Sequence, residues 1–205
     1  MKILIATTNQ NKVIRIKRLF KNIAFISLSD LDYKIEEPDE NGKDGVENAI
    51  IKAKYYYDHL KEKLPVLAQD DTLFLDEVSE EDNPKKDIKL PIIKKFGKFS
   101  DDNAYQYYSN LVKKYEKEYL ELEFRYGHAI CSENFLEGSA SKIPNGRLYA
   151  QVSSNKAPGY FFNAMTKMNI NGEWKYYSDL SEEDLINLDS DFKRSISSLF
   201  EKLNS

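Results

Sequence analysis

The feature that most constrains this chain is its opening segment, which joins a short apolar run to small polar residues and then to a helix. Lys2–Ala6 has the composition of a buried strand, and from Val13 apolar residues recur at helical spacing. Ala24–Leu28 is a second apolar run. These segments predict a βαβ unit and an α/β fold with a mixed central sheet flanked by helices.

The turn between the first strand and helix has the residue types of an anion site. Backbone N–H groups at a helix start have no partner within the helix and attract negative charge. Thr7 and Asn9 add side-chain donors, and Lys12 adds a cation about one turn into the helix. An equally good account of the turn alone is that Asn9 only caps the helix and Lys12 is solvated.

A second group consists of Glu40, Lys52 and Asp70. The loop, helix and strand that carry them are predicted to meet at the carboxyl ends of the strands, where open α/β folds bind ligands. Two carboxylates there suit Mg²⁺ or an activated water, and a lysine suits phosphate. Taken alone, a solvated acidic loop beside a helix lysine is the commoner arrangement. The adjacent Asp70 and Asp71 after a buried strand are more specific, because buried acids are costly unless paired or metal-bound.

Composition limits the class of protein. The chain has 205 residues, a net charge of −4 and a single cysteine, Cys131. The charge disfavours binding to a nucleic-acid polymer, and no apolar stretch is long enough to cross a membrane. One cysteine excludes an internal disulfide and fits a cytoplasmic protein. We expect a single domain over residues 1–205, with the charged segment 77–100 as an insertion or flap.

The remaining elements follow from caps, turns and periodicity. Asp44 is predicted to cap a helix that reaches about His59, and Asn171-Gly172 to form a hairpin turn. Ser181 is predicted to cap a final helical stretch whose apolar side includes Phe192. A helix is also predicted over Asn103–Tyr119. The prediction is completed by four short strands: Val66–Ala68, Leu73–Leu75, Phe124–Cys131 and Arg147–Ser153.

Three blocks of the sequence, in order, resemble the inosine triphosphate pyrophosphatase family. They are Ala6–Lys12, Glu40–Ala53 and Pro65–Thr72. Members of that family cleave non-standard purine nucleoside triphosphates to a monophosphate and pyrophosphate. The resemblance implies two lobes around a nucleotide-binding cleft, Mg²⁺ as cofactor, a nucleoside triphosphate as substrate and a homodimer.

The resemblance also implies roles for individual residues. Glu40 and Asp70 would hold Mg²⁺ and activate water, and Asp70 and Lys52 would be catalytic. A shift of the alignment by one residue would make Asp70 and Asp71 the acidic pair, with Asp71 beside the substrate. The residues implied to bind the triphosphate are Thr7, Asn9, Lys12 and Lys52.

Beyond residue 76 the likeness is weaker. The family's aromatic loop falls on Gly159–Met165, so Phe162 and Asn163 are the expected substrate-binding residues there, and Asn163 replaces an aspartate. The base-reading Lys and Ser-His-Arg fall on Leu185–Phe192, where no lysine, histidine or arginine stands. Phe161, Phe162 and Phe192 suit either an apolar stacking surface or the core. The substrate is therefore expected to be ITP, dITP or XTP, or a nucleotide with another base.

Two other functions compete with hydrolysis to pyrophosphate. The first is a non-catalytic nucleotide-binding or regulatory relative with a decayed base pocket. The second is a different phosphate-ester hydrolase that uses the same metal site and releases orthophosphate.

Overall fold

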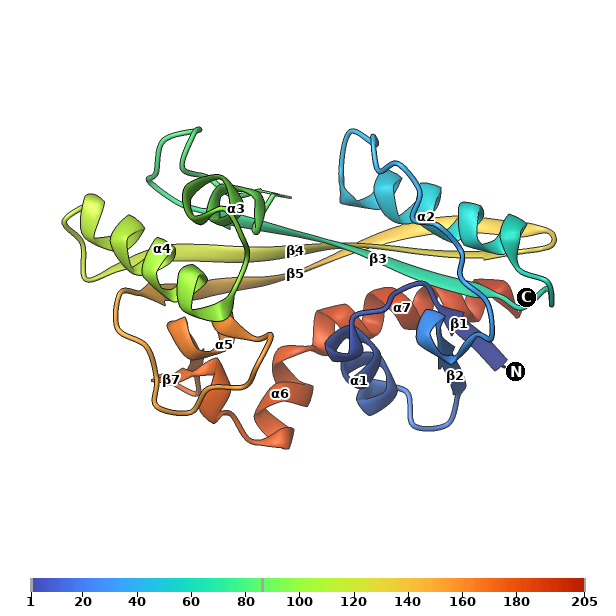
Figure 1. Ribbon diagram of the computed structural model, residues 1–205. Coiled ribbons are helices and arrows are strands. Elements are labelled where there is room, and N and C mark those ends of the chain that lie inside the picture. The colour runs from blue at the N-terminus through green and yellow to red at the C-terminus, as the bar shows by residue number, and fades with distance from the viewer. Residues whose placement is uncertain (1, 86, 205) are drawn as a thin grey trace. The chain divides into compact units, whose positions relative to one another are not determined.

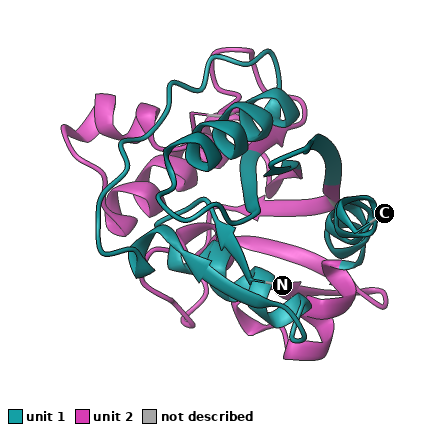
Figure 2. Ribbon diagram, turned by 90° about the vertical axis from the view of Figure 1, so that its right-hand side faces the viewer, with its two compact units in different colours: residues 1–71, 126–141, 190–205 teal, residues 72–125, 142–189 magenta. Residues whose placement is uncertain are grey.

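The computed structural model describes residues 2–85 and 87–204. The chain forms two compact units, shown in different colours in Figure 2. Unit 1 comprises residues 1–71, 126–141 and 190–205, and unit 2 comprises residues 72–125 and 142–189. Three long strands contribute residues to both units.

Unit 1 contains the predicted βαβ unit. Strand β1 (Lys2–Ile5) lies parallel to β2 (Ala24–Ser27), and helix α1 (Gln10–Leu19) connects them. Strand β3 (Val66–Leu75) pairs with the other side of β1, again in parallel. Strands β4 (Tyr119–Ser132) and β5 (Phe135–Tyr149) extend this sheet in the order β2-β1-β3-β4-β5.

Helices cover both faces of the sheet in unit 1 (Figure 1). Helix α2 (Gly45–His59) begins where the Asp44 carboxylate accepts the first free backbone N–H groups, as predicted. Its small residues Ala49 and Ala53 are fully buried against β1 and β3. Helices α1 and α7 (Ser190–Leu203) lie on the opposite face, where Phe20 and Phe200 meet edge to face at 5.2 Å.

Unit 2 has its own core. Strands β6 (Thr166–Ile170) and β7 (Glu173–Tyr176) form an antiparallel hairpin beside β5. Fully buried Tyr108 lies at the centre of the unit's aromatic cluster. The helices of unit 2 are α3 (Leu90–Phe96), α4 (Asp101–Lys114), α5 (Phe161–Met165) and α6 (Glu182–Leu188). Unit 2 also has a 3₁₀ helix at Tyr177–Asp179, and unit 1 has one at Leu28–Asp30.

Several predicted boundaries are wrong. Val66–Ala68 and Leu73–Leu75 are parts of the single strand β3, and the polar residues between them continue the strand. Asp70 and Asp71 have hydrogen-bond partners there. The predicted strand Arg147–Ser153 misses most of β5, which ends at Tyr149. The helix predicted over Asn103–Tyr119 ends at Lys114, and Tyr119 already begins β4.

The charged segment 77–100 contains helix α3, which the sequence did not predict. The helix has only seven residues, with Pro91 at its second position, and this is too short for a clear period. Its Ile92 is 0% exposed in the core of unit 2. Gly97 ends the helix in the left-handed conformation, with φ of 77°.

The predicted hairpin turn and the Ser181 cap agree with the sequence. Asn171 and Gly172 have φ of 55° and 90°, the two positive values that a two-residue hairpin turn requires. Ser181 caps α6, as predicted, and its bonds with Asp184 are reciprocal. The single final helical stretch that was predicted is instead two helices, α6 and α7, and Phe192 lies on the second. The predicted α/β class with a mixed sheet is therefore confirmed. Over residues 2–85 and 87–204, no helix has both the length and the apolar character needed to cross a membrane.

Candidate functional site

The turn after β1 is organised by side chains that bond to the backbone. Asn9 Oδ1 accepts a hydrogen bond from the N–H of Asn11 at 3.0 Å, and Thr7 Oγ1 accepts one from the N–H of Asn9 at 3.1 Å. Asn9 is thus the N-cap of α1, as one of the two interpretations predicted. Phosphate binding by Thr7 and Asn9 stays a prediction.

Lys12 is not a freely solvated lysine. Its Nζ lies 3.0 Å from Asp71 Oδ2, and its side chain is only 21% exposed. Gln69 Nε2 donates to the other carboxylate oxygen of Asp71. Burial raises the pKa of Asp71. The nearby Lys12 ammonium and these hydrogen bonds lower it by more than burial raises it, so the pKa lies below its ordinary value. Asp71 is therefore an ionised partner of Lys12 at neutral pH.

Two of the predicted site residues, Glu40 and Lys52, form an ion pair in unit 1. Lys52 Nζ lies 2.9 Å from Glu40 Oε1, and the lysine side chain is only 14% exposed. Lys52 belongs to α2, and Glu40 lies in the loop before it. The structure therefore brings these two predicted site residues into direct contact, and they are not separate surface charges.

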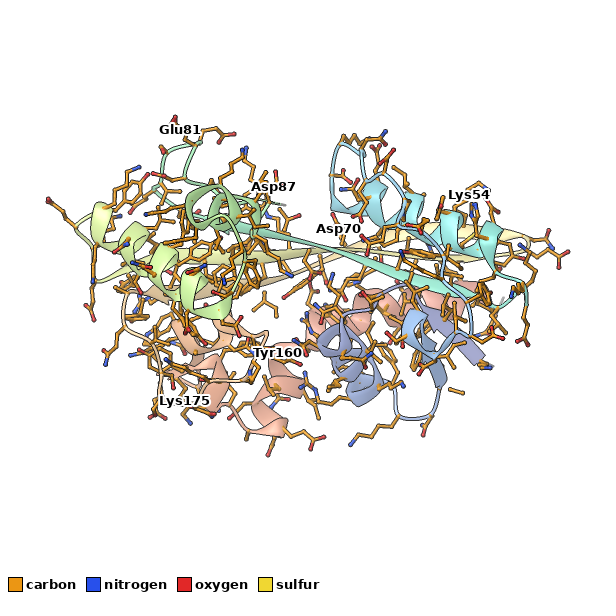
Figure 3. All side chains as sticks on the ribbon, viewed as in Figure 1. Lys54, Asp70, Glu81, Asp87, Tyr160 and Lys175 are labelled. Atoms are coloured by element: carbon orange, nitrogen blue, oxygen red, sulfur yellow. The ribbon has the colours of Figure 1, made fainter. Side chains whose placement is uncertain are left out.

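Asp70 lies on β3 and is labelled in Figure 3. Its Oδ2 accepts a hydrogen bond from Asn48 Nδ2 at 3.2 Å. Burial raises the pKa of Asp70, and the nearby charge of Glu40 raises it too. The hydrogen bond from Asn48 and the charge of Lys52 lower the pKa, but by less, so it stays above its ordinary value. A carboxylate with a raised pKa is typical of a general base, so Asp70 has the properties expected of a catalytic acid–base group.

The carboxylates expected to hold Mg²⁺ are those of Glu40 and Asp70. Among residues 2–85 and 87–204, no three His, Cys, Asp or Glu side chains gather into one possible metal site. Glu40 and Asp70 are nevertheless close enough for the charge of Glu40 to raise the pKa of Asp70. Mg²⁺ commonly takes one or two protein carboxylates and draws its other ligands from water and substrate phosphates.

Phe162 and Asn163 lie in helix α5 of unit 2. The Phe162 ring packs 4.8 Å from that of Tyr108 and 6.1 Å from that of Phe124. The neighbouring Phe161 and, in unit 1, Phe192 are 5% and 0% exposed, so the core interpretation holds for both. Substrate contacts of Phe162 and Asn163 stay predictions.

Two further residues of unit 1, Arg15 and His128, adjoin the Lys12–Asp71 pair, and neither was predicted from the sequence. The Arg15 guanidinium lies 3.8 Å above the ring of Phe192 and 4.4 Å above that of Tyr126. His128 is fully buried, with Nε2 2.7 Å from Ser141 Oγ. The helical spacing of Lys12 and Arg15 was the only available signal for the arginine.

Comparison with known proteins identifies the class of protein that this fold and site define. A sequence model described as the Ham1 family matches residues 3–162. The chain belongs to the Ham1 family, and the resemblance to inosine triphosphate pyrophosphatases is confirmed.

Individual relatives agree with this assignment. The chain is 37% identical over 110 residues to a dITP/XTP pyrophosphatase of Thermoanaerobacter pseudethanolicus, covering 44% of this chain and 53% of that protein. It is 44% identical over 75 residues to one of Nautilia profundicola, covering 34% and 35%. The chain thus spans about a third to a half of the length of these curated relatives.

Solved structures share the fold over almost the whole chain. A HAM1 protein from Coxiella burnetii superposes with a TM-score of 0.71 at 17% identity, over 98% of this chain and 99% of that one. The Ham1 protein of Staphylococcus aureus gives 0.66 at 19% identity, over 100% and 98%. At such identities the likeness establishes the fold.

Proposed function

We propose that this protein hydrolyses a non-standard purine nucleoside triphosphate, such as dITP, ITP or XTP, to the monophosphate and pyrophosphate. The observation that carries the proposal is the contact of Asp70 with Asn48 beside the Glu40–Lys52 ion pair. These groups belong to the sequence blocks that resemble the family, and the relatives named above act on dITP and XTP.

The chemistry follows from the groups in unit 1. Asp70 orients the attacking water and accepts its proton, for which a carboxylate with a raised pKa is suited. Lys52 and Lys12 offset the negative charge that develops on the phosphates as pyrophosphate leaves. Each lysine is already held by a carboxylate, so it is ordered before substrate binds.

Glu40 and Asp70 would hold Mg²⁺, which supplies charge neutralisation for the triphosphate when bound. Thr7 and Asn9 at the start of α1 would bind the phosphate chain, close to the positive end of that helix. Asp71 orders Lys12 and thus contributes to substrate binding indirectly.

The test is turnover of a panel of nucleotides with Mg²⁺, with both products identified. Monophosphate plus pyrophosphate supports the proposal, whereas orthophosphate indicates a different phosphate-ester hydrolase. Asp70→Asn should lower kcat by about 10²–10⁴-fold. Asp58→Asn, which changes an exposed acid of α2 paired with Lys54, is the matched control and should retain activity. Nucleotide-dependent stabilisation without any turnover would replace the proposal with a binding protein.

A further inference from the structure

Asn48 links two parts of the candidate site. It lies in the first turn of α2 and is only 2% exposed. Its Oδ1 accepts a hydrogen bond from the N–H of Gly42 at 2.8 Å, and its Nδ2 donates to Asp70 Oδ2 at 3.2 Å. One buried amide therefore connects the loop that carries Glu40 with the strand that carries Asp70.

The orientation of this amide is fixed by its partners. The Gly42 N–H is a donor only, so it must meet the oxygen of the Asn48 side chain. The NH₂ group then necessarily faces Asp70, which accepts the bond as a carboxylate. Aspartate at position 48 would keep the acceptor for Gly42 and lose the donor for Asp70.

The backbone of Gly42 lies so close to Asn48 that there is no room for a side chain at residue 42. A Cβ at residue 42 would lie 2.7 Å from Asn48 Oδ1 and 2.8 Å from the Asn48 backbone nitrogen. Only glycine lets the loop backbone come this near the amide without a shift. The loop is also held by the ion pair of Glu40 with Lys52, which lies one turn further along α2 on the same face as Asn48.

We propose that Asn48 is a positioning residue, which occupies one oxygen of Asp70 so that the other is directed at the reaction, and which fixes the Glu40 loop through Gly42. This inference rests on the proposed function and adds a residue to it. Asn48 acts through Asp70 and Glu40, and groups that orient a reactive carboxylate in this way commonly change activity 10–100-fold when they are removed.

The experiment uses the full chain and two variants that separate the two hydrogen bonds. Asn48→Leu removes both, and Asn48→Asp keeps the acceptor for Gly42 but puts a second carboxyl group against Asp70 in place of the amide donor. Amide hydrogen exchange at Gly42, followed by NMR, should accelerate in Asn48→Leu and stay slow in Asn48→Asp. Both variants should lower kcat about 10–100-fold with little change in KM. If Asn48→Leu does not fold, Asn48→Ala makes the same removal.

The control is Asn83→Asp in unit 2, whose amide also bonds in two directions, to the N–H and carbonyl of Leu75. It should lose stability with kcat unchanged. Unchanged Gly42 exchange in Asn48→Leu, or unchanged kcat in both Asn48 variants, would overturn the inference. A wild-type protein without turnover would instead refute the proposed function, and Gly42 exchange would still decide whether Asn48 holds the loop.

Discussion

Asp70 and Asp71 are adjacent in sequence but serve opposite faces of β3. Asp70 bonds to Asn48 of α2, whereas Asp71 lies 3.0 Å from Lys12 of α1. Successive side chains of a strand point to opposite faces, so one residue of register decides which acid meets which helix. Asp70 is the acid whose pKa the charges of Glu40 and Lys52 influence. This favours the alignment with the family in which Asp70, and not the pair Asp70 and Asp71, takes the catalytic position.

Asparagine substitutions should distinguish the two acids. Asp71→Asn should lower kcat less than about 10-fold, because an acid whose pKa is depressed beside Lys12 is a poor base. Asp70→Asn should cost about 100-fold or more. Steady-state kinetics on one substrate, with both variants checked by thermal unfolding, would measure the ratio. Equal losses would favour the shifted alignment in which both acids act together.

The parts of the fold that the sequence predicted are those with local signals. The first βαβ unit, the Asp44 cap and the Asn171-Gly172 turn each depend on neighbouring residues whose spacing is visible in the chain. The continuous strand β3 was not predicted because its residues 69–72 are polar. Asp70 and Asp71 lie in the strand with partners on α2 and α1, and these partners are remote in sequence.

The site shows the same division. Glu40, Lys52 and Asp70 could be grouped from sequence, since the ends of strands converge in α/β folds. The role of Asn48 could not, because its two bonds reach six residues back to Gly42 and 22 residues forward to Asp70. Lys12 was expected to face phosphate, and its Asp71 partner depends on which face of β3 that acid occupies.

Gly127 of β4 should tolerate a side chain less well than Gly138 of β5. A Cβ at residue 127 would lie 2.0 Å from the carbonyl oxygen of Gly45, the first residue of α2, and backbone cannot swing aside. We expect Gly127→Ala to lower the free energy of unfolding by about 3 kcal/mol. Gly138→Ala is the control, because its nearest contact at 2.6 Å is a methyl group of Val46. Denaturant unfolding should show the larger loss for Gly127→Ala.

Removing divalent metal should abolish turnover without unfolding the protein. Glu40 is already paired with Lys52, and Asp70 is already bonded to Asn48, so the fold does not depend on a cation to compensate either acid. With EDTA and no nucleotide, we expect Tm to change by less than about 2 °C. Activity should return when Mg²⁺ is added in excess. Turnover that persists in EDTA would contradict the role proposed for Glu40 and Asp70 in holding metal.

His128 should make the stability of the protein depend on pH. Burial and, to a smaller extent, Arg15 lower the pKa of His128 to about 3, so the folded protein keeps it neutral while the unfolded chain protonates it near pH 6.5. Its contribution is therefore complete above pH 6.5 and is lost as pH falls towards 3, at up to about 1.4 kcal/mol per pH unit. Between pH 6.5 and 5, His128→Gln should lose less stability in urea than the wild type. Parallel curves of stability against pH for His128→Gln and the wild type would refute the assignment.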